Sequence, residues 1–212
     1  LDLQSYLQEF AGAEPVDLLW SPPGMDGRGK ELSVAQARAN LGIPGEALVV
    51  ATVGRMDATK AVDTLIRALA GLQRAQPKLQ LILAGDGVME SHYQRMAADL
   101  GVNARFFGLR NDVENFYRAA DVVVLLFHTL GGTSSALLEA MTCGAAVVTN
   151  RIYGREAIPF EDQVSYADVD SPESVREAIS SILGSRELRL GLGERAQGYV
   201  ERNHGWTPFV AT

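Results

Sequence analysis

Short apolar runs alternate with segments of helical period from about residue 47 to residue 203. A nearly uninterrupted apolar run, such as residues 48–53, is typical of a strand buried on both faces, whereas the apolar positions between 65 and 72 fall on one face of a helix. Besides that helix, the pattern predicts strands at 48–53, 79–83, 105–107, 122–127, 145–149 and 164–167, and helices at 90–100, 113–119, 134–143, 172–183 and 187–203. Strands joined by helices indicate a doubly wound α/β domain, whose ligand site lies at the carboxyl ends of its parallel strands.

The first thirty residues follow a different pattern. Residues 16–20 have the pattern of one strand, but residues 21–29 are rich in Pro and Gly, as linkers are. Ser33 is expected to cap a helix that ends at Gly42. Because the chain opens on Leu1 rather than Met, we interpret it as part of a longer product.

The composition excludes several classes of protein. With 47% hydrophobic and 21% charged residues in 212, the chain has the make-up of a globular domain rather than a disordered one. Its 19 basic and 26 acidic residues give a net charge of −7, so we expect no nucleic-acid partner. Cys143 alone supports neither an internal disulfide nor a multi-cysteine metal site, which favours a reducing cytoplasmic setting. No apolar run approaches the ~18 residues of a membrane span, and the start lacks the basic region of a signal peptide.

Two cations follow the strand at 48–53. Arg55 and Lys60 lie in the segment Gly54-Arg55-Met56-Asp57-Ala58-Thr59-Lys60, just before a helix begins. Arg offers a bidentate fork, Lys a point charge and the helix N-terminus a partial positive charge, which together suit a diphosphate. From spacing alone, a solvated loop with two incidental cations stays an equal alternative.

A second candidate follows the strand at 122–127. The sequence Gly131-Gly132-Thr133-Ser134-Ser135 opens the helix that carries Glu139. The glycines let a ligand approach the backbone, the first-turn amides can receive an anion, and a carboxylate can accept hydrogen bonds from vicinal hydroxyls such as those of a ribose. A capped helix with one solvated Glu is the alternative.

Other motifs predict structure rather than chemistry. Residues 85–88 lack the third glycine of a dinucleotide fingerprint, and the chain has no P-loop. Asp168-Val169-Asp170 is followed by Ser171-Pro172, which favours the start of a helix over a metal motif. His92, His128 and His204 lack metal-type spacing, so no metal site is predicted, and Cys143 is interpreted as a core residue.

Several blocks of the sequence stand in a characteristic order and spacing. The strongest is residues 136–148, with Leu137-Leu138-Glu139-Ala140-Met141 at its centre; the others are 53–66, 83–87, 107–108 and 117–121. Taken together, these blocks resemble the C-terminal, donor-binding half of a family 4 glycosyltransferase with the two-domain GT-B fold. Their order and spacing match the family from about residue 16 to about residue 206.

The resemblance implies a Rossmann-like domain and its boundaries. Residues 1–30 would be the end of a preceding domain with the interdomain linker, residues 31–200 the nucleotide-sugar domain, and residues 201–212 the start of the segment that crosses back. The acceptor site would lie in the missing N-terminal domain, as would any contact with the inner face of a membrane.

The resemblance also implies an activity: transfer of a sugar, with retained configuration and no bound metal, from a UDP- or GDP-sugar to an acceptor. It implies that Arg55 and Lys60, beside Gly54, hold the diphosphate and stabilise its charge as the sugar leaves. It further implies that Gly108, Leu109 and Arg110 border the base, that the amides of Gly131, Gly132, Thr133, Ser134 and Ser135 face the diphosphate and sugar, and that Glu139 binds the ribose.

Four departures from the family pattern concern the sugar more than the nucleotide. Gly131 stands where a glutamate is usual, Phe127-His128 where Pro-Ser is common, Ala61 where glycine is frequent, and Thr133-Ser134 where Phe-Gly is common. Two alternatives to the transferase therefore stay open: a sugar-nucleotide-binding module without turnover, and another GT-B enzyme such as a sugar-nucleotide epimerase.

Overall fold

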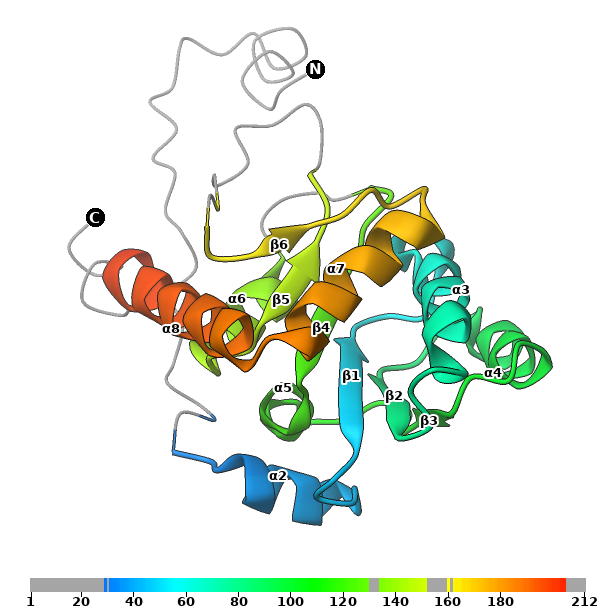
Figure 1. The fold of residues 1–212 in the computed structure, drawn as a ribbon, viewed down its shortest axis with the longest axis horizontal. Helices are drawn as coiled ribbons and strands as arrows, with labels where there is room; N and C mark the ends of the chain where they lie inside the picture. Colours follow the sequence, from blue (N-terminus) through cyan, green and yellow to red (C-terminus); the bar gives the residue numbers. More distant parts are fainter. Residues whose placement is uncertain (1–28, 30, 130–133, 152–159, 161, 205–212) are drawn as a thin grey trace, which may run out of the picture.

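The computed structural model describes residue 29, residues 31–129 and 134–151, residue 160 and residues 162–204. Its centre is a six-stranded sheet, parallel throughout, in the order β3-β2-β1-β4-β5-β6 (Figure 1). The strands are β1 (Leu48–Val53), β2 (Leu79–Ala84), β3 (Ala104–Phe106), β4 (Val122–Leu125), β5 (Val147–Thr149) and β6 (Ser165–Tyr166). The helices are α2 (Val34–Leu41), α3 (Val62–Gln73), α4 (Glu90–Asp99), α5 (Glu114–Ala119), α6 (Ser135–Thr142), α7 (Pro172–Gly184) and α8 (Arg186–Asn203), with a 3₁₀ turn, η1 (Ala58–Lys60).

Helices cover both faces of the sheet. On one face, the apolar side chains of α2, α5, α6 and α8 form a core cluster with Val49, Ala51 and Val123. On the other face, α3, α4 and α7 pack on Val50, Leu81 and neighbouring strand residues. The doubly wound α/β fold predicted from the apolar pattern is confirmed, and the predicted strand at 16–20 lies outside the described residues.

β5 and β4 are shorter than their apolar runs, for identifiable reasons. β5 begins at Val147 rather than at 145, because the amide of Ala145 donates to the carbonyl of Ala140 and closes α6. Gly144 makes that closure possible with a left-handed φ of 67°. β4 ends at Leu125 rather than at 127, because the backbone of Phe127 bonds to the side chain of Asn150.

Helix caps are formed by the residues predicted for them. Ser33 opens α2 in a capping box with Gln36, and Gly42 follows its end with a φ of 60°. Ser171 accepts a hydrogen bond from the amide of Ser174, with Pro172 in the first turn of α7. Residues 168–170 therefore lead into a capped helix, as expected.

The chain reverses its direction of winding between the two central strands. β1 leads to α3 on one face, whereas β4, paired with β1 at Val50↔Val122 and Ala51↔Val123, leads to α6 on the other. In open α/β sheets this switch point leaves a crevice beyond the carboxyl ends of the strands, where ligands bind.

Asp121 joins the opposite, amino ends of these two strands. Its Oδ2 accepts hydrogen bonds from the amide of Val49 at 2.9 Å and from Nη2 of Arg38 at 3.0 Å, and its own amide donates to Val49 O at 2.8 Å. Arg38 also donates to the carbonyl of Ala119. A nearly buried ion pair thus fixes the relative position of β1 and β4.

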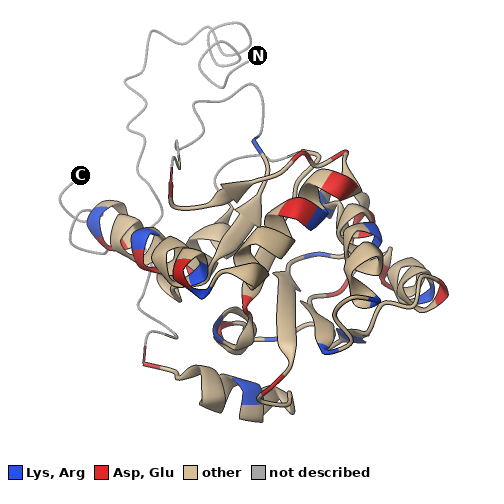
Figure 2. Cartoon of the chain, in the orientation of Figure 1, with Lys and Arg blue, Asp and Glu red and all other residues tan. Residues whose placement is uncertain are grey.

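The described helices carry no membrane-crossing candidate, since each is too short or too polar to cross a bilayer. Figure 2 shows acidic and basic positions interspersed along α7 and α8.

Replacing Asp121 by Ala should lower the free energy of unfolding by about 3–5 kcal/mol, because the Arg38 guanidinium would remain nearly buried without its counter-charge. Urea denaturation measures the change. Asp162, 65% exposed in its ion pair with Arg195, is the matched control, and its replacement by Ala should cost only about 0–1 kcal/mol. Equal losses in the two variants would contradict a structural role for the Asp121 network.

Candidate functional site

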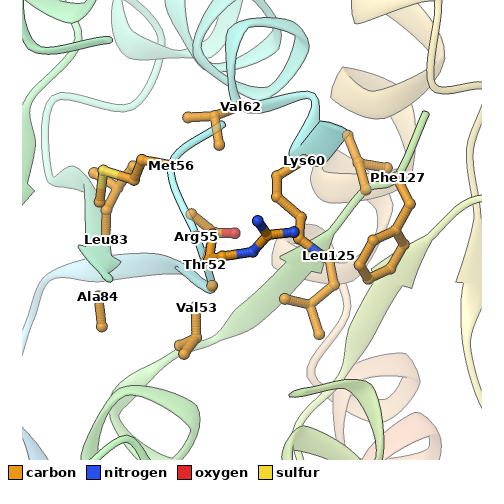
Figure 3. Close-up of a pocket in the computed structure, with 12 residues that line it drawn as sticks. Thr52, Val53, Arg55, Met56, Lys60, Val62, Leu83, Ala84, Leu125 and Phe127 are labelled. Atoms are coloured by element: carbon orange, nitrogen blue, oxygen red, sulfur yellow. The ribbon is translucent and has the colours of Figure 1, made fainter. Parts of the chain in front are cut away.

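A small pocket lies at the carboxyl edge of the sheet, between the ends of β1, β2 and β4 (Figure 3). Apolar side chains such as Leu83 and Leu125 line its base, and the loop after β1 contributes Gly54, Arg55 and Lys60. The two cations predicted from the sequence therefore belong to one concave site at the switch point.

Backbone hydrogen bonds join the loops that follow β1, β2, β3 and β4 into one rim. The bonds run from Gly54 N to Ala84 O at 3.0 Å, from Met56 N to Asp86 O at 2.7 Å, from Gly85 N to Gly108 O at 2.7 Å, and from His128 N to Thr59 O at 2.9 Å. The backbone of each loop is thus held by its neighbours before any ligand arrives.

Glycine is required where these loops touch. A Cβ atom on Gly85 would lie 1.9 Å from the carbonyl oxygen of Gly54, and one on Gly87 would lie 2.5 Å from that of Met56. Gly85 also has a φ of 129°, which L side chains rarely adopt. The Gly85-Asp86-Gly87 sequence thus serves close packing of the two loops beside Arg55.

Arg55 is exposed and paired with Asp57. Its side chain is 75% exposed, and Nη1 lies 3.1 Å from Oδ2 of Asp57. Asp57 caps η1 and accepts a hydrogen bond from the amide of Thr59 at 2.9 Å. The hydrogen bond from the Thr59 hydroxyl, with smaller contributions from the Thr59 amide, Arg55 and Lys60, lowers the pKa of Asp57, so this residue is a carboxylate at neutral pH.

Lys60 ends η1 and lies over an aromatic ring. Its Nζ is 4.6 Å from the centroid of the Phe127 ring, within the range of a cation–π interaction (Figure 3). Partial burial lowers the pKa of Lys60, and the charge of Asp57 opposes that effect. The ammonium is therefore held at the pocket by the Phe127 ring and favoured by the nearby charge of Asp57.

Phe127 is held in place by burial of its ring and by hydrogen bonds to its backbone. Its side chain is 3% exposed, its amide donates to Oδ1 of Asn150, and its carbonyl accepts from Nδ2 of Asn150, both at 2.9 Å. The side-chain amide of the buried Asn150 thus makes the two backbone hydrogen bonds that a neighbouring strand would make to Phe127 if β4 continued. Phe127, which departs from the family pattern, therefore supports the predicted cation site.

Glu139 lies on α6 and is half-buried. The hydroxyl of Tyr117, from α5, donates to Oε2 of Glu139 at 3.1 Å. Cys143, at the end of the same helix, is 2% exposed, and burial raises the pKa of its thiol to about 12, which confirms it as a core residue.

The predicted base-binding loop is joined to the rim. Gly108 has a φ of 65° and its carbonyl is the acceptor for Gly85, while Leu109 is 73% exposed. Arg110 forms two hydrogen bonds with Asp112, from Nε at 2.8 Å and from Nη2 at 2.7 Å. That pairing commits the Arg110 guanidinium to its own loop.

Other predicted residues differ in how far the structure places them. Ser134 is the buried residue before α6, and Ser135 is the first, exposed residue of the helix. Gly131, Gly132 and Thr133 lie outside the described residues. In the part of the chain that the structure describes, no group of three or more His, Cys, Asp and Glu side chains is placed to hold a metal ion.

Sequence reasoning did not assign four residues that shape the site: Asp57, Phe127, Asn150 and Tyr117. Asp57 stands between the two cations, so its pairing with Arg55 could have been inferred from proximity. Tyr117 falls in a block that carries the family resemblance, but its contact joins two helices distant in the sequence. Nothing in the sequence indicates that the side chain of Asn150 bonds to the backbone of Phe127.

Comparison with known proteins establishes the family. Residues 33–199 match the family described as glycosyl transferases group 1. The chain belongs to this family. Its six-stranded parallel α/β fold matches structures of GT-B glycosyltransferases.

Individual relatives agree with this assignment. The chain is 31% identical over 208 residues to the D-inositol 3-phosphate glycosyltransferase of Segniliparus rotundus, covering 93% of this chain and 46% of that protein. It is 25% identical to WaaG, a glycosyltransferase involved in lipopolysaccharide biosynthesis, with a TM-score of 0.84 over 98% of this chain and 58% of the other. HepE of Anabaena, solved in complex with UDP, shares the fold with 21% identity and a TM-score of 0.77 over 88% and 53% of the two chains. The chain spans about half the length of the curated relatives it matches.

Replacing Gly85 by Ala should lower the free energy of unfolding by about 3 kcal/mol, because the new methyl group must displace the Gly54 carbonyl and the backbone must keep an unfavourable φ. Gly101, whose φ is 68° and whose Cβ would meet nothing within 4 Å, is the control. Its replacement by Ala should cost only about 1 kcal/mol, for the left-handed backbone alone. The two variants are compared by urea denaturation. An equal loss of unfolding free energy would show that the close approach of the two loops does not require glycine at position 85.

Proposed function

We propose that this chain is the donor-binding half of a family 4 retaining glycosyltransferase, which moves a sugar from a UDP- or GDP-sugar to an acceptor. The observation that carries the proposal is the placement of Arg55 and Lys60 together at the switch-point pocket of a glycosyl transferase group 1 domain. The UDP bound to HepE, a protein of the same fold, supports a nucleoside diphosphate as ligand.

Arg55 is available to a diphosphate despite its ion pair with Asp57. An exposed ion pair of this kind contributes about 0–1 kcal/mol, whereas a charge-assisted hydrogen bond to a phosphate contributes about 1.5–3 kcal/mol. The side chain is 75% exposed and free to turn, while Asp57 is held by Thr59. The diphosphate therefore replaces Asp57 as the partner of the Arg55 guanidinium. When the site is empty, the Asp57 carboxylate compensates part of the positive charge.

Lys60 supplies a second, fixed charge. Its ammonium already lies over Phe127, so little side-chain freedom is lost when it meets a phosphate oxygen. As the bond between sugar and diphosphate breaks, negative charge grows on the leaving diphosphate. Lys60, which is fixed in advance, and Arg55, which turns onto the ligand as it binds, stabilise that charge with little reorganisation at the moment of reaction, and they take the place of a metal ion in our proposal.

The remaining predicted residues complete a donor site. Gly54 permits close approach at the diphosphate, Glu139 accepts hydrogen bonds from the ribose hydroxyls, and Gly108, Leu109 and Arg110 border the base. The exposed Leu109 offers an apolar contact to a base, whereas Arg110, paired with Asp112, stiffens the loop. Backbone amides of residues 131–135 meet the diphosphate and sugar.

In this proposal the acceptor is bound by a separate domain of the whole protein, in keeping with relatives about twice as long. The 212-residue chain then binds a nucleoside diphosphate and transfers no sugar, because a reaction between two substrates needs both held in line. Membership of a glycosyl transferase family favours transfer over epimerisation.

Replacing Arg55 or Lys60 by Ala should weaken UDP binding to this chain about ten-fold or more, since each removes a charge-assisted contact of roughly 1.5–3 kcal/mol. Isothermal titration calorimetry with UDP and GDP measures the affinities. Arg67→Ala is the matched control: Arg67 is exposed on α3, its loss changes the net charge equally, and affinity should stay within two-fold. Unchanged affinity in both site variants would favour the alternative interpretation, in which residues 54–60 are a solvated loop with two incidental cations.

A further inference from the structure

Tyr117 is a buried polar side chain that the diphosphate chemistry does not use. It lies on α5 at 1% exposure, in the core cluster that also holds Leu138 and Met141 of α6. Its hydroxyl leaves this apolar cluster at one point, where it donates to Oε2 of Glu139 at 3.1 Å. The buried hydroxyl therefore does more than pack in the core, because its hydrogen bond restrains the orientation of the half-buried Glu139 carboxylate.

The direction of this hydrogen bond is fixed. Burial, together with the nearby charge of Glu139, raises the pKa of Tyr117 above its usual value, so the hydroxyl keeps its proton at neutral pH. An ionised carboxylate has no proton to donate and can only accept. Tyr117 is therefore the donor in its hydrogen bond to Oε2.

The bond also restricts what Glu139 can do. A glutamate side chain in solvent samples many rotamers, and it must give up this freedom when it binds a ligand. Here the ring of Tyr117 is immobilised by the core, so its hydroxyl holds Oε2 in place. Oε1 and the remaining lone pair of Oε2 are left for a second partner on the half-exposed side of Glu139.

We propose that Tyr117 is a positioning residue for ribose recognition: its hydroxyl orients the Glu139 carboxylate so that the two vicinal hydroxyls of a nucleoside diphosphate are bound by a preset acceptor. This inference rests on the proposed function, because it takes Glu139 as the ribose-binding residue. It adds a specificity determinant, since a preset acceptor distinguishes a ribose from a sugar that lacks those hydroxyls.

The test uses this chain with UDP, GDP and their 2′,3′-dideoxy counterparts, with affinities measured by calorimetry. Tyr117→Phe keeps the ring and removes only the hydroxyl. It should weaken binding of the preferred ribonucleotide about five- to ten-fold and leave the dideoxy form within two-fold. In a Glu139→Ala background, Tyr117→Phe should have no further effect on either ligand.

Tyr166→Phe is the matched control, because the Tyr166 hydroxyl also makes one hydrogen bond, at 2.7 Å to the carbonyl of Phe160, without contact to Glu139. It should change neither affinity. Glu139→Gln is a second variant that does not disturb the core: its amide oxygen can still accept from Tyr117, but discrimination between ribo and dideoxy forms should fall. Thermal unfolding of each variant confirms that it is folded.

The outcomes separate the inference from the proposed function. An equal loss for ribo and dideoxy forms in Tyr117→Phe, or no loss, overturns the positioning role. Full discrimination in Glu139→Gln overturns the role of the Glu139 carboxylate as the ribose acceptor, and with it the inference. Wild-type protein that binds both forms equally, but loses binding in Arg55→Ala, overturns the inference and leaves the diphosphate site intact. Wild-type protein that binds neither UDP nor GDP overturns the inference and the proposed function together.

Discussion

The site depends on the hydrogen bonds that join the loops at the carboxyl edge of the sheet. Parallel strands end at this edge side by side, but their loops lead to helices on opposite faces and would separate without a connection. Backbone bonds between the loops, among them Gly85 to Gly108 and His128 to Thr59, supply that connection. Because these bonds use the backbone and the tight contacts use glycine, the side chains of the rim remain available for a ligand.

The positive charge at the rim is partly compensated before a ligand binds. Asp57 lies between two cations, pairs with the exposed Arg55 and lowers the cost of holding the partly buried Lys60 as an ammonium. The Phe127 ring adds a second support for that ammonium. A diphosphate can then take over the guanidinium while the lysine stays in place, so one cation is mobile and the other is fixed.

The sequence predicted the sheet, the helices and the edge that carries the site, because each of these follows from apolar period and from local caps such as Ser33 and Ser171. It also placed Arg55 and Lys60 correctly at the carboxyl end of a buried strand, since both are close in sequence to that strand end. The shortened β4 and the supports of the site were missed. They depend on contacts between residues far apart in the chain, Asn150 with Phe127 and Tyr117 with Glu139, which no local pattern encodes.

The proposed function requires above all that a nucleoside diphosphate binds at the carboxyl edge, across the loops of β1 and β4. Backbone amide chemical shifts of the ¹⁵N-labelled chain, followed during a titration with UDP, test it most directly. We expect saturable changes concentrated in residues 54–60, 108–110 and 134–139, with little change at the amino edge around Arg38 and Asp121. Changes concentrated at that amino edge, or an unaltered spectrum at millimolar UDP, would contradict it.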